Sequence, residues 1–162
     1  MYEIVEKKKI APGITSIKVN APALAKGAKP GQFVILMVRE KGERIPLTIA
    51  DYDRKGGTIR MVFESVGKTT SMLSTLKEGD ELFSLVGPLG IPSEIKNYGT
   101  VITVGGGIGV APVYPIAREL KEAGNKVISI IGSRTKDILI MEKEMKEVSS
   151  ELLIATNDGS YG

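Results

Sequence analysis

The sequence predicts two consecutive units of different fold class, a small antiparallel β-barrel over residues 1–98 and an α/β unit over residues 99–162. Two observations support this prediction. Up to about residue 86, short segments of strand-like residues are separated by Gly and Pro turns, which is typical of antiparallel strands. From Thr100 onward, β-branched runs alternate with helical spacing, which is typical of the βαβ units of a doubly wound fold.

Five short strands are expected in the first 65 residues, separated by turn residues such as Pro12-Gly13. They are expected at residues 2–7, 14–19, 33–38, 44–50 and 58–64. A short helix should begin at Thr69 or Thr70, because Met72 and Leu76 continue a helical spacing after a Ser/Thr cap region. One more strand follows at residues 81–86. Such a set closes on itself and thereby removes exposed strand edges.

The second unit is expected to contain three strands and two helices. The strands are predicted at residues 100–104, 126–131 and 151–156, and the helices at residues 111–123 and 138–145, the second with Asp137 as its N-cap. The first strand alternates poorly between apolar and polar residues, so we expect it to be buried on both faces. The set is small for a doubly wound fold, and we expect the chain to be a fragment of a longer protein.

A glycine cluster lies between the first strand and the first helix of the second unit. Gly105, Gly106, Gly107 and Gly109 lack a Cβ where the backbone must turn, and the helix N-terminus that follows favours an anion. The cluster fits Gly-x-Gly-x-x-Gly imperfectly, since Val110 stands where the third glycine is expected. A dinucleotide phosphate site and a turn that binds nothing therefore both remain open.

A second phosphate-like motif, Gly67-Lys68-Thr69-Thr70, precedes the helix of the first unit. It suggests an ATPase phosphate loop, but the first glycine of that loop would stand at position 62, which is Val62. The ATPase interpretation therefore fails. Two interpretations remain, a helix N-terminus that holds phosphates and a simple helix cap.

The composition excludes several kinds of chemistry. The chain has no Cys and no His, which excludes disulfides, Cys/His metal sites, a thiol nucleophile and a histidine base, so redox chemistry would require a cofactor. Its 22 basic and 19 acidic residues are interleaved, which argues against nucleic-acid binding. Because the sequence has neither a signal peptide nor an 18-residue apolar run, we expect a cytoplasmic protein without a membrane span.

Four motifs, in this order along the chain, resemble those of the ferredoxin–NADP reductase superfamily. They are Arg44-Ile-Pro-Leu-Thr-Ile, Gly67-Lys-Thr-Thr-Ser, Gly87-Pro-Leu-Gly and the stretch from Val104 to Pro112. In that superfamily a FAD-binding barrel precedes a nicotinamide-binding α/β domain. The sequence resembles most the group of dihydroorotate dehydrogenase electron-transfer subunits and the small subunits of sulfide dehydrogenase and NADH-dependent ferredoxin–NADP oxidoreductase.

The resemblance implies roles for particular residues. Arg44 is expected to bind the FAD pyrophosphate, and Thr48 is expected to be the catalytic residue, with its hydroxyl at the N5 edge of the flavin. The other residues implied in binding FAD or the nicotinamide nucleotide are Pro46, Leu47, Gly67, Lys68, Thr69, Thr70, Gly105, Gly106, Gly107 and Gly109. The plain alternatives are a solvated strand arginine and a threonine favoured by its β propensity.

Three further residues bear on the choice of nucleotide. An NAD-specific protein usually has an acidic residue after the second strand of the βαβ unit, whereas this chain has Ser133 and Arg134, which suit a 2′-phosphate. We therefore expect NADP(H) in preference to NAD(H). Asp158 either borders the nicotinamide pocket or lies in a turn.

The expected function is flavin-mediated electron transfer, in which NAD(P)H reduces FAD and single electrons pass to an iron–sulfur centre or a partner subunit. Ferredoxin is a candidate acceptor, and a hetero-oligomer is expected for the longer protein. The resemblance also implies a [2Fe-2S] cluster, but only beyond these 162 residues. The alternative is a non-catalytic regulatory or scaffold module that retains the fold without cofactor turnover.

Overall fold

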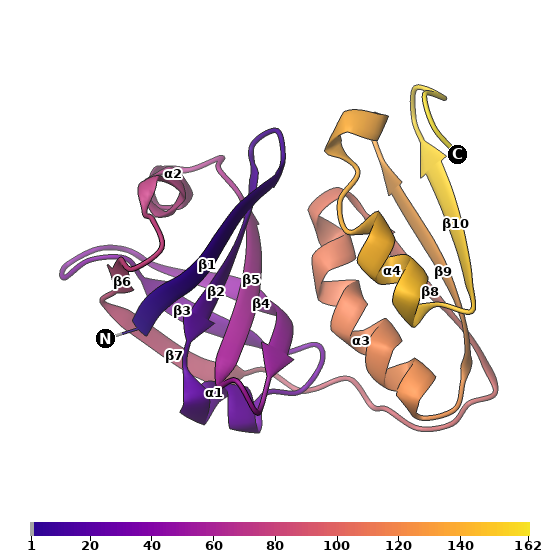
Figure 1. Cartoon of the computed structure of the whole chain (residues 1–162), viewed down its shortest axis with the longest axis horizontal. Helices are drawn as coiled ribbons and strands as arrows, with labels where there is room; N and C mark the ends of the chain where they lie inside the picture. Colours follow the sequence, from indigo (N-terminus) through magenta and orange to yellow (C-terminus); the bar gives the residue numbers. More distant parts are fainter. Residues whose placement is uncertain (1) are drawn as a thin grey trace. The chain divides into compact units, whose positions relative to one another are not determined.

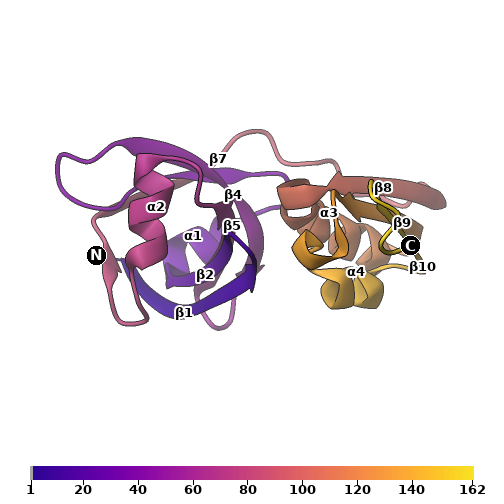
Figure 2. The same ribbon diagram turned by 90° about the horizontal axis from the view of Figure 1, so that it is seen from above.

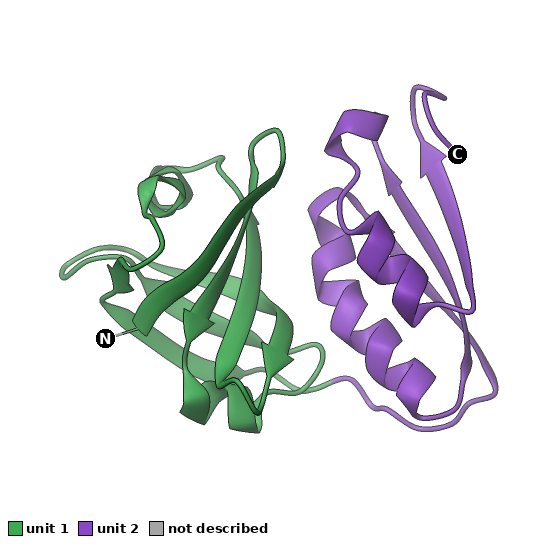
Figure 3. Cartoon of the chain, viewed as in Figure 1, with its two compact units in different colours: residues 1–92 green, residues 93–162 purple. Residues whose placement is uncertain are grey.

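The computed structural model describes residues 2–162, which divide into two compact units on either side of the Pro92–Ser93 bond (Figure 3). This division lies earlier in the chain than the boundary predicted after residue 98. Residues 96–98 belong to the second unit because Asn125 binds them. The Tyr98 N–H donates to Asn125 Oδ1 (2.6 Å), and Asn125 Nδ2 donates to the Lys96 carbonyl (2.9 Å).

The first unit is a seven-stranded antiparallel sheet that closes almost completely into a barrel (Figure 1). Its strands are β1 (Tyr2–Ala11), β2 (Ile14–Asn20), β3 (Phe33–Met37), β4 (Arg44–Asp53), β5 (Thr58–Glu64), β6 (Glu81–Leu82) and β7 (Ser84–Leu89), in the order β6-β1-β2-β5-β4-β3-β7. The two strands at the ends of this order are separated in sequence only by Phe83, so the chain itself joins the edges. The predicted antiparallel barrel is confirmed.

The barrel encloses one apolar core, and two short helices contribute to it. Among the fully buried side chains are those of Ile4, Ile17, Leu36, Ile49, Met61 and Phe63. Helix α1 (Pro22–Gly27), which was not predicted, starts with proline and adds Leu24 and Ala25 to this core. Helix α2 (Lys68–Thr75) lies close to its predicted position and buries Leu73.

The second unit is a parallel three-stranded sheet with helices. The strands β8 (Thr100–Gly106), β9 (Lys126–Ser133) and β10 (Glu151–Thr156) lie in the order β10-β9-β8. The helices are α3 (Val110–Glu122) and α4 (Glu142–Val148), and two short 3₁₀ turns are η1 (Gly107–Gly109) and η2 (Lys136–Ile138). This confirms the predicted α/β unit. Within residues 2–162, no helix is long and apolar enough to cross a lipid bilayer.

The prediction that the strand at residues 100–104 is buried on both faces is wrong. Ile102 and Val104 on β8 are 64% and 66% exposed, and Leu153 on β10 is 46% exposed. Both helices pack on the same face of the sheet, as Figures 1 and 2 show, and no described residue forms a helix over the other face. Apolar residues therefore lie on an open sheet face as well as in the core.

The predicted start of the second helix is also wrong. Asp137 is not its N-cap, because residues 136–138 form η2 and the helix begins only at Glu142, after Met141 in the left-handed conformation (φ 57°). Between them the backbone extends at Leu139, and the side chains of Ile140 and Met141 are buried. The buried apolar residues Ile140 and Met141 therefore lie in the segment that connects η2 to α4 and not in a helix.

A chain of buried hydroxyl groups joins helix α4 to the sheet. Thr103 Oγ1 lies 2.8 Å from Ser129 Oγ, which lies 2.6 Å from Ser149 Oγ, and Ser149 donates to the Met145 carbonyl (2.6 Å). Thr103, Ser129 and Ser149 are all at most 9% exposed. Each buried hydroxyl thus has a partner, which offsets the cost of removing it from water.

Candidate functional site

Three of the predicted site residues form a row on the outer face of β4. Because side chains alternate along a strand, Arg44, Pro46 and Thr48 lie on the face opposite the core. Leu47 is different, since it packs against the apolar core inside the barrel. At this site Leu47 can therefore offer only its backbone to a ligand on the outer face.

The row on β4 carries polar groups that are free to bind a ligand. Arg44 is exposed and Thr48 is half-buried, and residues 2–162 provide no hydrogen-bond or ion-pair partner for either side chain. The strand pairing places Phe33 of β3 opposite Thr48. A flat ligand on this face would thus meet an aromatic ring, a hydroxyl group and a guanidinium group that can form paired hydrogen bonds with an anion.

The residues at the start of α2 have separate roles. Thr70 caps the helix, because the Gly67 N–H donates to Thr70 Oγ1 (3.0 Å). Thr69 is buried, and its hydroxyl donates to the carboxylate of Glu43. Since Glu43 directly precedes Arg44, this contact brings the two predicted FAD elements to the same end of the first unit.

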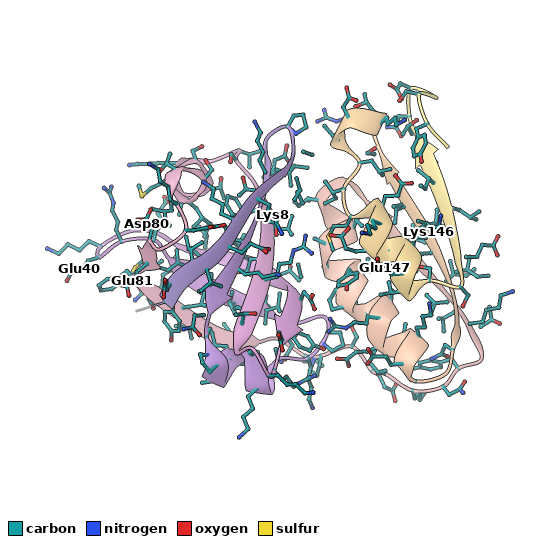
Figure 4. The ribbon with its side chains drawn as sticks, in the orientation of Figure 1. Lys8, Glu40, Asp80, Glu81, Lys146 and Glu147 are labelled. Atoms are coloured by element: carbon teal, nitrogen blue, oxygen red, sulfur yellow. The ribbon has the colours of Figure 1, made fainter. Side chains whose placement is uncertain are left out.

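A pocket of about 110 Å³ is lined by residues of the β3–β4 hairpin and of helix α2. Its lining residues are Val38, Arg39, Lys41, Gly42, Glu43, Lys68, Thr69 and Met72. No described residue forms an ion pair with the three cationic side chains in this set. Glu40, in the same hairpin, points away from the barrel (Figure 4). Three cationic side chains and the one carboxylate of Glu43 give the pocket a net positive charge beside a helix N-terminus, which suits an anion.

Arg39, Lys41 and Glu43 were missed as site residues in the sequence. Their position depends on the hairpin lying against α2, a contact between segments 26 residues apart at Glu43 and Thr69. The one local signal was the density of charge in Arg39-Glu40-Lys41-Gly42-Glu43-Arg44, which is also typical of a solvated turn.

The glycine cluster of the second unit contains glycines of two kinds. A Cβ at Gly105 would lie 3.0 Å from Val110 Cα and 3.2 Å from the Gly109 carbonyl oxygen, so the close approach of β8 to α3 requires glycine there. Gly107 has φ 54°, a conformation that favours glycine. The fold itself therefore explains why positions 105 and 107 are occupied by glycine.

Gly106 and Gly109 have no such explanation within the fold. Their φ angles of −118° and −65° are ordinary, and a Cβ at either position would meet nothing within 4 Å apart from the backbone adjoining it in the chain. A side chain would therefore fit both the backbone and the packing. The open space at the end of β8 and the start of α3 is what a phosphate group needs to approach the backbone closely.

Gly105→Ala is expected to destabilise the second unit by about 1–3 kcal/mol, because its Cβ would press on the backbone of Val110. Gly106→Ala, one residue away, should cause no comparable loss. Hydrogen exchange of the β8 amides measures both effects locally. Equal protection in the two variants would contradict the distinction between the two kinds of glycine.

The three residues that bear on nucleotide choice lie at the carboxyl ends of two strands, Ser133 and Arg134 at the end of β9 and Asp158 after β10. Ser133 is buried, and its hydroxyl donates to the Thr135 carbonyl (2.7 Å). Arg134 is exposed, and residues 2–162 provide no partner for its guanidinium group. Asp158 accepts hydrogen bonds from the N–H (3.0 Å) and the hydroxyl (2.7 Å) of Ser160, so it closes a turn. Of the three, Arg134 has the side chain most open to a ligand.

The hydrogen bonds in the turn at Asp158 lead to a testable prediction about how the stability of the turn depends on pH. Hydrogen bonds from the Ser160 hydroxyl and N–H hold the pKa of Asp158 below its ordinary value of 3.8. The stability that this turn contributes is therefore fully present above pH 3.8 and is lost as the pH falls through the lowered pKa. An NMR titration of the carboxyl carbons should show Ser160→Ala raising the pKa of Asp158. Asp53, whose pKa is lowered by other N–H groups, serves as the unchanged reference.

Comparison with known sequences shows relatives along the whole chain, although no family model matches it. A dihydroorotate dehydrogenase B (NAD(+)) electron transfer subunit homolog from Thermotoga maritima is 56% identical over 162 residues, which are 100% of this chain and 57% of the relative. The dihydroorotate dehydrogenase B (NAD(+)) electron transfer subunit of Enterococcus faecalis is 33% identical over 167 residues, with 100% of this chain and 63% of the relative covered. The chain thus spans less than two thirds of these relatives.

Solved structures likewise match nearly all of this chain but only part of their own length. A chain from the structure of NADH-dependent reduced ferredoxin–NADP oxidoreductase, described in connection with flavin-based electron bifurcation, matches with a TM-score of 0.94 and 54% identity. The match covers 100% of this chain and 58% of the other. Phthalate dioxygenase reductase matches with a TM-score of 0.74 and 22% identity over 98% of this chain and 51% of its own, which supports the fold alone.

Proposed function

We propose that this chain, a homologue of dihydroorotate dehydrogenase electron-transfer subunits with the ferredoxin reductase-like fold, binds FAD and a pyridine nucleotide as part of a flavoprotein electron-transfer subunit. The predicted resemblance to these proteins is confirmed. The observation that carries the proposal is the pair of glycines, Gly106 and Gly109, which neither backbone conformation nor packing requires. A ligand that approaches this turn closely accounts for them.

The residues of the first unit fit FAD. When bound, FAD and the nicotinamide nucleotide would supply the redox chemistry, which is hydride transfer followed by single-electron transfer. Arg44 is proposed to hold the pyrophosphate, because its guanidinium group is exposed and has no partner among residues 2–162. Thr48 is proposed to donate a hydrogen bond at the N5 edge. No side-chain acid or base is needed.

The proposed preference for NADP(H) depends mainly on one residue, Arg134. Arg134 is proposed to bind the 2′-phosphate of NADP(H), since its side chain is exposed after the carboxyl end of β9. Ser133 and Asp158 remain proposed neighbours of the nucleotide. Their polar groups are held by Thr135 and Ser160, so binding through these side chains would require local rearrangement.

The partners are proposed from the relatives. The names of the relatives describe electron-transfer subunits, so we propose that this chain acts in a hetero-oligomer with a catalytic or electron-accepting subunit. Ferredoxin is one candidate acceptor. The 162 residues contain no cysteine, and a [2Fe-2S] cluster would need cysteines outside them.

The rival proposal is a module that keeps the fold without cofactor turnover. One observation favours it, namely that the hydroxyl groups of Thr69, Thr70 and Ser133 are already held by groups of the chain. Spectroscopy of the purified chain distinguishes the two proposals. Bound FAD should give flavin absorbance that NADPH or NADH bleaches without oxygen, whereas a colourless protein that ignores added FAD would favour the module.

A further inference from the structure

The pocket between the β3–β4 hairpin and α2 combines three kinds of lining group. Arg39, Lys41 and Lys68 provide positive charge, and Val38 and Met72 provide apolar surface. Glu43 provides a carboxylate. A nucleoside monophosphate presents the three matching groups, which are a phosphate, a flat apolar base and a ribose diol whose hydroxyls can donate hydrogen bonds.

The carboxylate of Glu43 is the group that a pure phosphate site would not need. Although three cationic side chains line the same pocket, no described residue forms an ion pair with Glu43, and its hydrogen bond comes from the buried hydroxyl of Thr69. Thr69 thereby fixes the carboxylate at the pocket wall. A fixed anion repels a phosphate, so it reduces affinity unless the ligand also brings hydrogen-bond donors to it.

We infer that this pocket holds the AMP half of FAD, with Glu43 accepting hydrogen bonds from the ribose hydroxyls and so selecting FAD over FMN. The inference rests on the proposed function, because it names the residue that recognises the end of the flavin cofactor distant from its ring. FMN ends at a phosphate and lacks the ribose of the AMP half. It can therefore use the cations of the pocket but gains nothing from Glu43.

Flavin titration of the purified chain tests the inference, because FAD and FMN share the same fluorescent ring. Glu43→Gln keeps the shape of the side chain and removes its charge. It should weaken the affinity for FAD about tenfold, because hydrogen bonds to a charged group are stronger than those to a neutral amide, and it should leave the affinity for FMN equal or higher. Thr69→Val should shift the FAD-to-FMN ratio in the same direction by releasing the carboxylate. Calorimetry with ADP, which lacks the flavin ring, should show the same loss in Glu43→Gln.

Glu40→Gln is the matched control, since Glu40 lies in the same hairpin and points away from the barrel (Figure 4). It should leave the affinities for FAD, FMN and ADP unchanged. If Glu43→Gln leaves the ratio of the FAD and FMN affinities unchanged, or raises both affinities equally, the carboxylate only repels phosphate and the inference is overturned. If the unaltered chain binds neither flavin, the proposed function fails together with it.

Discussion

Gly106→Val is expected to lower the affinity for NADP(H) and NAD(H) by about 100-fold or more, because a branched side chain would occupy the space that the nucleotide phosphates need. The fold should tolerate the change. Gly106 has extended backbone angles (φ −118°, ψ 136°) that suit valine, and a Cβ there would meet nothing within 4 Å apart from its own residue and its two chain neighbours. Calorimetric titration with each nucleotide measures the affinity, and urea denaturation measures the free energy of unfolding.

Thr100→Val provides the matched control for Gly106→Val. Thr100 lies six residues earlier on β8, on the same face of the strand, and is exposed. Valine there introduces the same side chain about 20 Å from the glycine turn, given the rise of about 3.3 Å per residue in a parallel strand. Nucleotide affinity should be unchanged in this control. Full affinity in Gly106→Val as well would remove the turn from the proposed site.

Gly107→Val is a weaker test of the same site. Gly107 has φ 54°, so valine would strain the backbone whether or not a nucleotide binds there. A loss of binding in that variant would not separate a folding defect from a blocked site. Gly106 and Gly109 avoid this difficulty because their backbone angles are open to any residue.

Arg44→Ala is expected to weaken FAD binding about 10- to 100-fold, as removal of hydrogen bonds from a charged group to phosphate costs about 1.5–3 kcal/mol. The free energy of unfolding should stay within about 0.5 kcal/mol of the unaltered chain, because Arg44 is exposed and no described residue pairs with it. Flavin fluorescence titration gives the dissociation constant.

Two variants control for the Arg44 prediction. Arg44→Lys keeps the charge but loses the paired hydrogen bonds, so it should recover only part of the affinity. Lys29→Ala removes a positive charge from another exposed position of the first unit and should leave FAD binding intact. If Arg44→Ala and Lys29→Ala behave alike, the contribution of Arg44 is general electrostatic attraction rather than contact with the pyrophosphate.

Periodicity in the sequence was sufficient to predict the elements that satisfy it locally. The strands around Pro12-Gly13 and the helix after the glycine cluster each follow from their own residues and turns. Helix α1 was missed because its six residues, Pro22–Gly27, are too few to establish a period. The segment before α4 misled because apolar residues can be buried by an extended connection as well as by a helix.

The candidate site was predicted in part for the same reason. The row of Arg44, Pro46 and Thr48 follows from alternation along one strand, and so does the inward position of Leu47 once the buried face is known. The contact between Glu43 and Thr69 joins a hairpin to a helix, and no local pattern encodes it. The exposure of Ile102 and Val104 likewise depends on which face of the sheet the helices cover.

The chain of hydroxyl groups at Thr103, Ser129 and Ser149 constrains how this sequence can diverge. An apolar residue at position 129 would leave the buried hydroxyl of Thr103 without its partner, whereas Ser149 would keep its bond to the Met145 carbonyl. An apolar residue at position 103 or 149 alone would leave Ser129 with its other partner. We therefore expect homologous sequences that are apolar at position 129 to be apolar at position 103 as well.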